Sequence, residues 1–250
     1  MRLEGKVALV TGGNAGIGKA TAIAFAREGA RVAIVGRRAE EGEQVLKIIQ
    51  QSGREAIFVQ ADVTKSGDCI KMVTDTVEAF GRLDIAFNNA GVGRAGKFVA
   101  DVDEADWDLV MDVNVKGVFL SMKYEIPELL KTGGGAIINT SSIGGLIASQ
   151  GQSAYQASKH ALQGLTKAAA LEYAQRGIRV NSICPGPVRT PMVERWFAMP
   201  GVQEKILGSI PMGRIAEPDE IAQAVIYLAS DDARFVTGSS LVLDGGFVAQ

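Results

Sequence analysis

Short apolar runs rich in β-branched residues alternate along the chain with longer segments of helical period. This alternation is typical of a parallel sheet whose strands are joined by crossover helices. The first four runs begin about 25 residues apart, which is the size of a βα unit. We therefore predict an α/β fold, a doubly wound sheet of seven parallel strands flanked by helices. The predicted strands are residues 6–11, 31–35, 55–60, 83–87, 135–141, 178–184 and 240–244.

The helical segments between these runs end at glycines that lead directly into the next strand. Residues 18–29 close at Gly29 and residues 153–177 close at Gly177, as expected for left-handed C-terminal caps. No linker or low-complexity tract interrupts the pattern, so we predict one domain over residues 1–250. Only residues 185–218 lack a clear period. Because long irregular segments inside compact domains are usually functional, we expect a functional loop there.

Composition narrows the choice of partners and location. Hydrophobic residues make up 47% and charged residues 22% of the chain, as in ordinary globular proteins. The formal net charge is −2 and no Lys/Arg cluster is present, which argues against a nucleic-acid partner. No segment has the apolar length of a signal peptide or a membrane span, so we expect a cytoplasmic protein without a membrane partner. Cys69 and Cys184 lack metal-ligand spacing and are expected to be free thiols, and no metal site is predicted.

A glycine-rich turn, "TGGNAGIG" at residues 11–18, follows the first predicted strand and leads into a helix. A strand, turn and helix in this order present backbone N–H groups and the positive end of a helix dipole to a phosphate. The spacing is Gly12-x-x-x-Gly16-x-Gly18, in which the first glycine allows the turn and the later ones allow close approach. A tight turn that binds nothing is the alternative. The flanking strand and helix favour a nucleotide site.

The end of the second predicted strand indicates which dinucleotide binds. An acid is expected there for the ribose hydroxyls of NAD, or a base for the 2′-phosphate of NADP. Gly36 stands at the expected position of the acid, and Arg37 and Arg38 follow it. A guanidinium binds phosphate bidentately, so we predict NADP(H), with NAD(H) as the alternative. Three glutamates could instead neutralise the arginines and leave an ordinary helix start: Glu40, Glu41 and Glu43.

The stretch "YQASK" places Tyr155 and Lys159 one helical turn apart. A phenol has a pKa of about 10, and bringing it toward 7 requires about 4 kcal/mol of preference for the phenolate. One ammonium about 4 Å away supplies about that much at an effective dielectric of 20. The pair is therefore a candidate acid–base couple, the alternative being two side chains that snorkel from one helix face. His160 points about 100° away from Lys159 around the helix, and we expect it to pack or lie at the surface.

Further polar residues stand at the ends of predicted strands or inside a helix. Asp62 and Asn89 follow the third and fourth strands, and Ser142 ends the fifth, at the edge where open α/β sheets bind ligands. Ser141 should point the other way if that strand continues. Asn114 lies in a helix, where asparagine has a poor propensity. Taken singly, these residues are more commonly a helix cap, a turn, a hydroxyl bonded to its own turn and a solvent-facing amide.

Together these motifs resemble the short-chain dehydrogenase/reductase family, in its one-domain form of roughly 250 residues with a Rossmann-type sheet. The resemblance covers essentially the whole chain and rests on "TGGNAGIG", "NNAG", the Asn of "MDVNVKGVF", a Ser 13 residues before "YQASK", "PGPVRTPM" and "DGG". It implies that Tyr155 is the proton donor or acceptor, with Lys159 as its partner and a holder of the nicotinamide ribose. Ser142 would hydrogen-bond the substrate oxygen, and Asn114 would support a water-linked proton path. The implied cofactor-binding residues are Gly12, Asn14, Gly16, Ile17, Gly18, Arg37, Arg38, Asp62, Val63, Asn89, Tyr155, Lys159, Val188 and Thr190.

The implied activity is the NADP(H)-dependent interconversion of ketones and secondary alcohols, with Tyr155 as acid and base. The expected substrate residues are Ser142, Gln152, Tyr155, Met192 and Trp196. The loop at about 190–215 would line an apolar pocket with Met192, Trp196, Phe197, Met199, Ile206 and Leu207, unless these residues form an amphipathic helix packed on the sheet.

Three alternatives to this activity remain at the level of sequence. A 3-oxoacyl-thioester reductase would show a basic patch for its acyl carrier protein, for which Arg94, Lys97 and Arg195 are a thin candidate. A sugar dehydrogenase suits an apolar loop less well. A non-catalytic NADP sensor could lack the tyrosine or lysine, yet all four catalytic candidates are present. The resemblance also implies a homotetramer.

Overall fold

The computed structural model describes residues 1–250, and all seven predicted strands are present in one parallel sheet. The strand order is β3-β2-β1-β4-β5-β6-β7, in which the direction of winding reverses between β1 and β4. Each strand lies within two residues of its predicted bounds, because a strand buried on both faces leaves a continuous apolar run in the sequence. The bounds are β1 (Val7–Thr11), β2 (Arg31–Gly36), β3 (Ala56–Gln60), β4 (Ile85–Asn88), β5 (Gly135–Thr140), β6 (Ile178–Pro185) and β7 (Ser240–Leu243).

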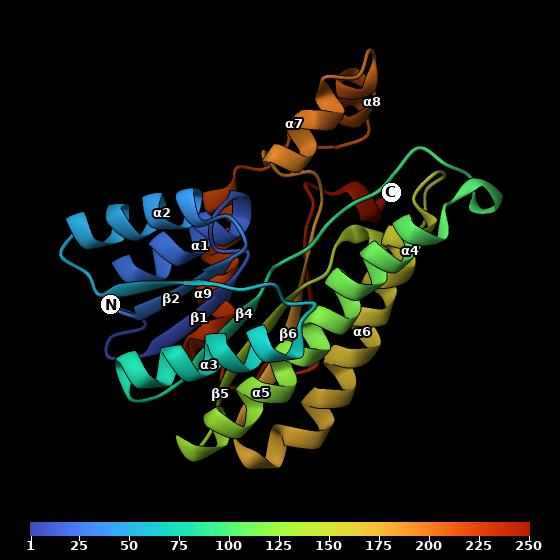
Figure 1. Ribbon diagram of the computed structural model, residues 1–250. Coiled ribbons are helices and arrows are strands. Elements are labelled where there is room, and N and C mark those ends of the chain that lie inside the picture. The colour runs from blue at the N-terminus through green and yellow to red at the C-terminus, as the bar shows by residue number, and fades with distance from the viewer.

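Helices cover both faces of the sheet, as Figure 1 shows. One layer consists of α1 (Gly16–Arg27), α2 (Ala39–Gln51) and α9 (Pro218–Ala229). The other consists of α3 (Ser66–Phe80), α4 (Glu104–Met111), α5 (Gly117–Lys131) and α6 (Ser153–Tyr173). Each layer buries its own apolar cluster against the sheet, one of 27 residues and the other of 25. The predicted doubly wound α/β fold is thereby confirmed.

A π-helical turn, Asp112–Lys116, joins α4 to α5. Such turns add a residue to a helix and occur frequently at functional sites. This one contains Asn114, whose side chain is fully buried. The π-helical turn therefore directs the polar side chain of Asn114 inward. The sequence pattern of the helix did not predict this turn.

The segment at residues 185–218 differs from the predicted irregular loop. It contains two short helices, α7 (Pro191–Phe197) and α8 (Val202–Gly208), which project beyond the sheet at the top of Figure 1. Thr190 caps α7 by accepting a hydrogen bond from the backbone N of Val193, and Pro191 occupies the first helical position. Each helix has only seven residues, too few for a helical period to show in the sequence. Their apolar side chains pack in a small cluster around Val193, Ile210 and Ile215, the last two of which lie in the segment after α8.

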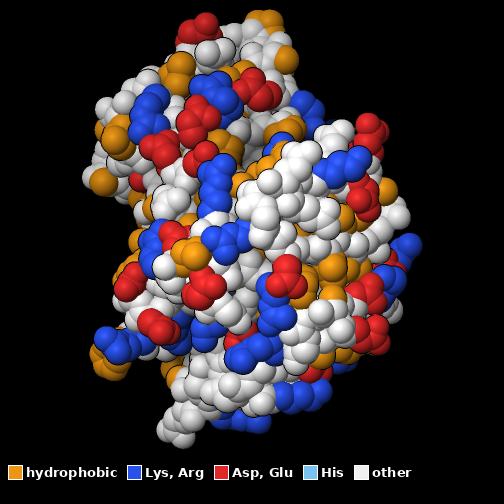
Figure 2. Space-filling view, turned by 90° about the vertical axis from the view of Figure 1, so that its left-hand side faces the viewer, with side chains coloured by type: hydrophobic (Ala, Val, Ile, Leu, Met, Phe, Trp, Pro, Cys, Tyr) orange, Lys and Arg blue, Asp and Glu red, His pale blue; other side chains and the backbone are white.

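Surface charge is mixed in sign. Figure 2 shows acidic and basic side chains interspersed over the face that it presents. None of the helices combines the length and apolar character that crossing a bilayer requires.

Candidate active site

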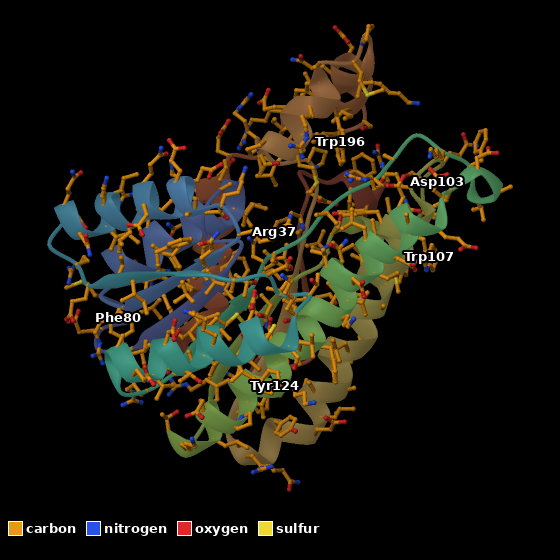
Figure 3. The ribbon with its side chains drawn as sticks, viewed as in Figure 1. Arg37, Phe80, Asp103, Trp107, Tyr124 and Trp196 are labelled. Carbon is orange, nitrogen blue, oxygen red and sulfur yellow. The ribbon has the colours of Figure 1, made fainter.

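A cleft of about 1200 Å³ runs along the carboxyl ends of the strands. Its lining includes the glycine turn, the arginines after β2, the start of α6 and one side of α7. In Figure 3, Arg37 lies at the sheet edge and Trp196 lies above it on α7. Most of the residues predicted from sequence line this cleft: Gly12, Asn14, Gly16, Ile17, Arg37, Arg38, Asp62, Val63, Asn89, Ser142, Gln152, Tyr155, Lys159, Val188, Thr190, Met192 and Trp196.

The glycine turn is packed too closely for any larger residue at its last position. A methyl group on Gly18 would lie 2.2 Å from the Gly12 carbonyl oxygen and 2.6 Å from Asn89 Nδ2. Gly18 is buried and does not line the cleft, so its part in the site is to let α1 approach the turn. Gly12 has a φ of 64° and Gly16 a φ of 52°, values that favour glycine. The turn thus has the shape that a pyrophosphate needs for close contact with backbone.

The two arginines after β2 have different surroundings. Arg38 lies 3.2 Å from Glu41, so one of the predicted neutralising glutamates does pair with it. With its amide oxygen turned toward the guanidinium, Asn14 also accepts from Arg38 Nε and Nη2, both at 3.2 Å. Arg37 has a single carboxylate neighbour, Asp62, at 4.0 Å, and its side chain is 58% exposed. Arg37 is therefore the freer of the two to bind an anion.

Asp62 lines the cleft, as predicted, and also closes a turn. Its Oδ1 accepts from the backbone N and hydroxyl of Thr64, at 3.0 and 2.9 Å, which closes the turn after β3. Its Oδ2 faces Arg37, and the side chain lines the cleft. Asp62 therefore closes a turn and is not the helix cap of the alternative interpretation, because the N-cap of α3 is Lys65; its other oxygen still faces Arg37.

Tyr155, Ser142 and Lys159 meet at the centre of the cleft. A methyl group on Gly144 would lie 3.5 Å from both Ser142 Oγ and Tyr155 Cε1, so the two side chains flank the same glycine. Lys159 is buried, lies 5.6 Å from the centre of the Tyr155 ring and donates from Nζ to the Thr140 carbonyl at 2.7 Å. The four-residue spacing on α6 therefore places the phenol and the ammonium on one face, as predicted.

The pKa of the phenol shifts in the direction opposite to the expectation. Burial raises the pKa of Tyr155, and the nearby Ser142 hydroxyl acts in the opposite direction but more weakly. Burial also lowers the pKa of Lys159 to about 8. We expected the ammonium to lower the pKa of Tyr155, but here it is bonded to the Thr140 carbonyl, and burial has the largest effect on that pKa. The phenol in this arrangement is therefore protonated at neutral pH.

Asn114 lies behind the cleft and connects two segments of its wall through hydrogen bonds. Its Oδ1 accepts from the Val92 backbone N at 2.8 Å, and its Nδ2 donates to the Val92 carbonyl at 2.9 Å and to Ser158 Oγ at 3.0 Å. A methyl group on Gly91 would lie 3.4 Å from Asn114 Oδ1 and 3.7 Å from Lys159 Nζ. Asn114 is therefore next to the lysine, joins the segment after β4 to α6, and is not the solvent-facing amide of the alternative interpretation.

Three of the five predicted substrate residues meet at Gly93, a position that the sequence did not indicate. A methyl group on Gly93 would lie 3.4 Å from Met192 Sδ and 3.8 Å from both Trp196 Cζ2 and Tyr155 Cδ2. Met199 and Ile206 also line the cleft, whereas Phe197 and Leu207 do not and instead pack in the cluster formed by α7 and α8. Half of the helical alternative is thus correct: the segment is helical, but it does not pack flat on the sheet.

His160, Ser141 and the two cysteines have the structural roles that the sequence predicted. His160 is exposed and its Nδ1 lies 2.9 Å from the Gln156 carbonyl oxygen. Ser141 contributes to the cleft lining, but its buried hydroxyl donates to the Lys159 carbonyl and accepts from Gln163 Nε2, so it is bonded to α6. Both cysteines are buried free thiols.

Known proteins resemble this chain over nearly all of its length. A family model described as enoyl-(acyl carrier protein) reductase matches residues 12–248. An A-factor type gamma-butyrolactone 1′-reductase (1S-forming) from Streptomyces virginiae is 47% identical over 98% of this chain and 96% of its own length. A cyclohexanol dehydrogenase from Acinetobacter sp. (strain SE19) is 42% identical over 100% of this chain and 97% of its own.

A solved structure extends the similarity to three dimensions. The crystal structure of levodione reductase superposes with a TM-score of 0.96 at 36% identity, and the match covers 99% of both chains. The chain accordingly belongs to the short-chain dehydrogenase/reductase family, whose members are oxidoreductases that use NAD(P) and act on alcohol and carbonyl groups.

Proposed function

We propose that the protein is an NADP(H)-dependent oxidoreductase that interconverts ketones and secondary alcohols. The observation that carries this proposal is that Tyr155, Ser142 and Lys159 line the same cleft as Arg37 and the glycine turn. A proton donor and a phosphate-binding turn at opposite ends of one cleft are what hydride transfer to a carbonyl requires.

The cofactor end favours a ligand rich in phosphate. Among the lining residues five are Lys or Arg and only Asp62 is acidic, so the cleft attracts anions. Gly36 supports NADP over NAD. A methyl group there would lie 2.7 Å from the end of the Asn14 side chain, so an acidic side chain in the place that NAD would require forces Asn14 to move. Arg37, which lacks a close carboxylate partner, is the proposed partner of the 2′-phosphate.

The residues at the catalytic end of the cleft have distinct proposed roles. When bound, the nicotinamide cofactor supplies or accepts the hydride. Tyr155, whose pKa burial raises, holds a proton for the carbonyl oxygen during reduction and takes one back during oxidation. Ser142 flanks the same space and orients that oxygen with its hydroxyl. Lys159 and Asn114 sit behind Tyr155, where they fix the strand end and supply the polar path through which the phenol regains its proton.

The substrate class follows from the wall opposite Tyr155. Met192, Trp196 and Met199 make that wall apolar, with Gln150 and Gln152 as polar contacts at its rim. Two relatives are named for cyclic compounds, one for cyclohexanol and one for a gamma-butyrolactone. We therefore propose small or medium apolar ketones, cyclic ones included, and their alcohols.

A 3-oxoacyl-thioester reductase is the second candidate, because the matched family model is described by an acyl-carrier-protein substrate. Its expected basic patch is weak. Arg94 pairs with Asp106 at 3.0 Å, and Lys97 pairs with Asp103 and Asp106, which leaves Arg195 alone among the three candidates. A sugar dehydrogenase fits the apolar wall poorly, and a non-catalytic sensor would not need the complete set of catalytic side chains.

Tyr155→Phe tests the mechanism. We expect the rate of ketone reduction with NADPH to fall by about 10²- to 10⁴-fold, the range for loss of a general acid, while NADPH still binds. Tyr173→Phe on the same helix, outside the cleft, is the matched control and should keep the wild-type rate. An unchanged rate in Tyr155→Phe would exclude the proposed acid.

A panel of cyclic ketones, oxoacyl thioesters and sugars, each assayed with both cofactors, separates the candidate substrates.

A further inference from the structure

A second group of buried polar side chains lies behind the cleft, where β4 and β5 face α5 and α6. It consists of Asn88, Glu125, Asn139 and Thr166, and none of these side chains is more than 1% exposed. Asn88 Nδ2 donates to Glu125 Oε2 at 3.0 Å and to Asn139 Oδ1 at 3.3 Å, and Asn139 Nδ2 donates to Thr166 Oγ1 at 3.0 Å. The group therefore joins four elements, and in Figure 1 its helices α5 and α6 run side by side.

Two acceptors in this group have no partner. Glu125 Oε1 and Asn88 Oδ1 are both buried and neither receives a hydrogen bond. The amide of Asn88 cannot be reversed to help, because its Nδ2 already faces two oxygens. An ionised Glu125 would leave both acceptors unsatisfied and would bury a charge that no Lys or Arg pairs with, a costly arrangement.

We propose that Glu125 is a neutral carboxylic acid whose Oε1 hydroxyl donates to Asn88 Oδ1, closing a two-bond acid–amide pair that positions the ends of β4 and β5. One proton then satisfies both unpartnered atoms. Every polar atom that Asn88 and Glu125 turn toward each other has a partner in this arrangement, as buried polar groups generally do.

The pair acts on the active site through the residues that follow it in the chain. Asn88 precedes Asn89, whose backbone N bonds Thr11 Oγ1 at 3.0 Å and whose Nδ2 bonds the Thr11 carbonyl at 3.2 Å, next to the glycine turn. Asn139 precedes Thr140, whose carbonyl holds Lys159 Nζ. Glu125 does not line the cleft, so it is a positioning residue for the lysine and the turn.

The surroundings of Glu125 favour the neutral acid. The titratable group that faces it is Cys69 on α3, whose thiol donates to the Val63 carbonyl and whose pKa burial raises to about 12, so it is uncharged. The residues that meet it from β4, β5 and α6 in this group are amides and a hydroxyl. Burial raises the pKa of Glu125 to about 8, against which the bond from Asn88 acts more weakly.

The raised pKa of Glu125 determines the direction in which the stability of the protein changes with pH. Between pH 4.5 and about 8 the folded protein keeps the Glu125 proton, whereas the unfolded chain loses it. The stability that this proton contributes is therefore complete below pH 4.5 and is lost as the pH rises through about 8. Lys159, whose pKa burial lowers to about 8, shifts stability in the opposite direction and only above about pH 8, so measurements below pH 8 isolate Glu125.

Glu125→Gln tests the proposal with the whole protein. A glutamine accepts with one atom and donates with the other, so it keeps both bonds without a titrating proton. We expect the infrared carbonyl band of a protonated carboxylic acid in the wild type at pH 7 and its loss in E125Q. We also expect the Tm of E125Q relative to wild type to increase steadily from pH 5 to pH 8. Glu128→Gln on the same helix, at the surface where Glu128 pairs with Lys131, should change neither measurement.

A second pair of variants tests the positioning role. Glu125→Met has a similar length but no hydrogen bond, and we expect it to lower kcat with NADPH by up to about 100-fold, whereas E125Q keeps the wild-type kcat at pH 7. Equal kcat values for the two variants would exclude the positioning role. A wild type without the acid band, or a Tm profile that E125Q leaves unchanged, would overturn the neutral acid itself. Neither the band nor the profile depends on the reaction catalysed.

Discussion

At the scale of single residues, the spacing of Tyr155 and Lys159 predicted their contact but not their charge. The ammonium donates to the Thr140 carbonyl, and burial raises the pKa of the phenol. A pKa reports the balance between desolvation and nearby charge, and only the folded surroundings decide that balance. The same reasoning separates Arg37 from Arg38, which are adjacent in sequence yet differ in their carboxylate neighbours.

Arg37→Ala tests the choice of cofactor at this scale. Because a hydrogen bond to a charged group contributes about 1.5–3 kcal/mol, we expect kcat/KM with NADPH to fall about 10- to 100-fold and kcat/KM with NADH to change little. The measurement is the ratio of the two constants in wild type and variant. Arg176→Ala, at the far end of α6, is the control. A preference for NADPH that survives the loss of Arg37 would contradict its proposed role.

At the scale of elements, the first strand, the glycine turn and α1 form one closely packed unit. Gly18→Ala would force a methyl group to within 2.2 Å of the Gly12 carbonyl oxygen. We expect a loss of about 1–3 kcal/mol in the free energy of unfolding, as overpacking usually costs, together with weaker NADPH binding. Denaturant unfolding and a cofactor titration measure the two effects.

Gly164→Ala is the matched control for that substitution. Gly164 lies exposed inside α6, where an added methyl group meets no atom within 4 Å. Alanine should there stabilise the protein by up to about 1 kcal/mol, because it has the better helix propensity. If both alanine variants had the same stability, close packing at Gly18 would not be the reason for the glycine.

At the scale of the whole molecule, the helical layer of α4, α5 and α6 carries large exposed apolar side chains. Leu171 on α6 is 83% exposed, Phe119 on α5 is 48% exposed and Trp107 on α4 is 41% exposed. Figure 3 shows Trp107 pointing outward from α4. Exposed apolar groups on neighbouring helices support the proposal that copies of the chain associate through this layer into a homotetramer.

Leu171→Glu tests this assembly. A charge in the middle of an apolar interface costs desolvation, so we expect the variant to have a lower mass than wild type in light scattering coupled to size-exclusion chromatography. Ile48→Glu on α2, in the opposite helical layer, is the control and should leave the mass unchanged. A wild-type protein that elutes as a monomer would contradict the tetramer directly.

The sequence by itself determined the strands, the glycine turn and the pairing of Tyr155 with Lys159, because each depends on local spacing: continuous apolar runs, residues that permit special φ angles, and one turn of helix. Only the tertiary structure decided what depends on distant neighbours. The inward turn of Asn114, the meeting of Met192, Trp196 and Tyr155 at Gly93, and the contact between Asn88 and Glu125 join residues that are far apart in the chain. Burial and hydrogen-bond partners arise from such contacts, so charge states and positioning residues became visible only in the folded protein.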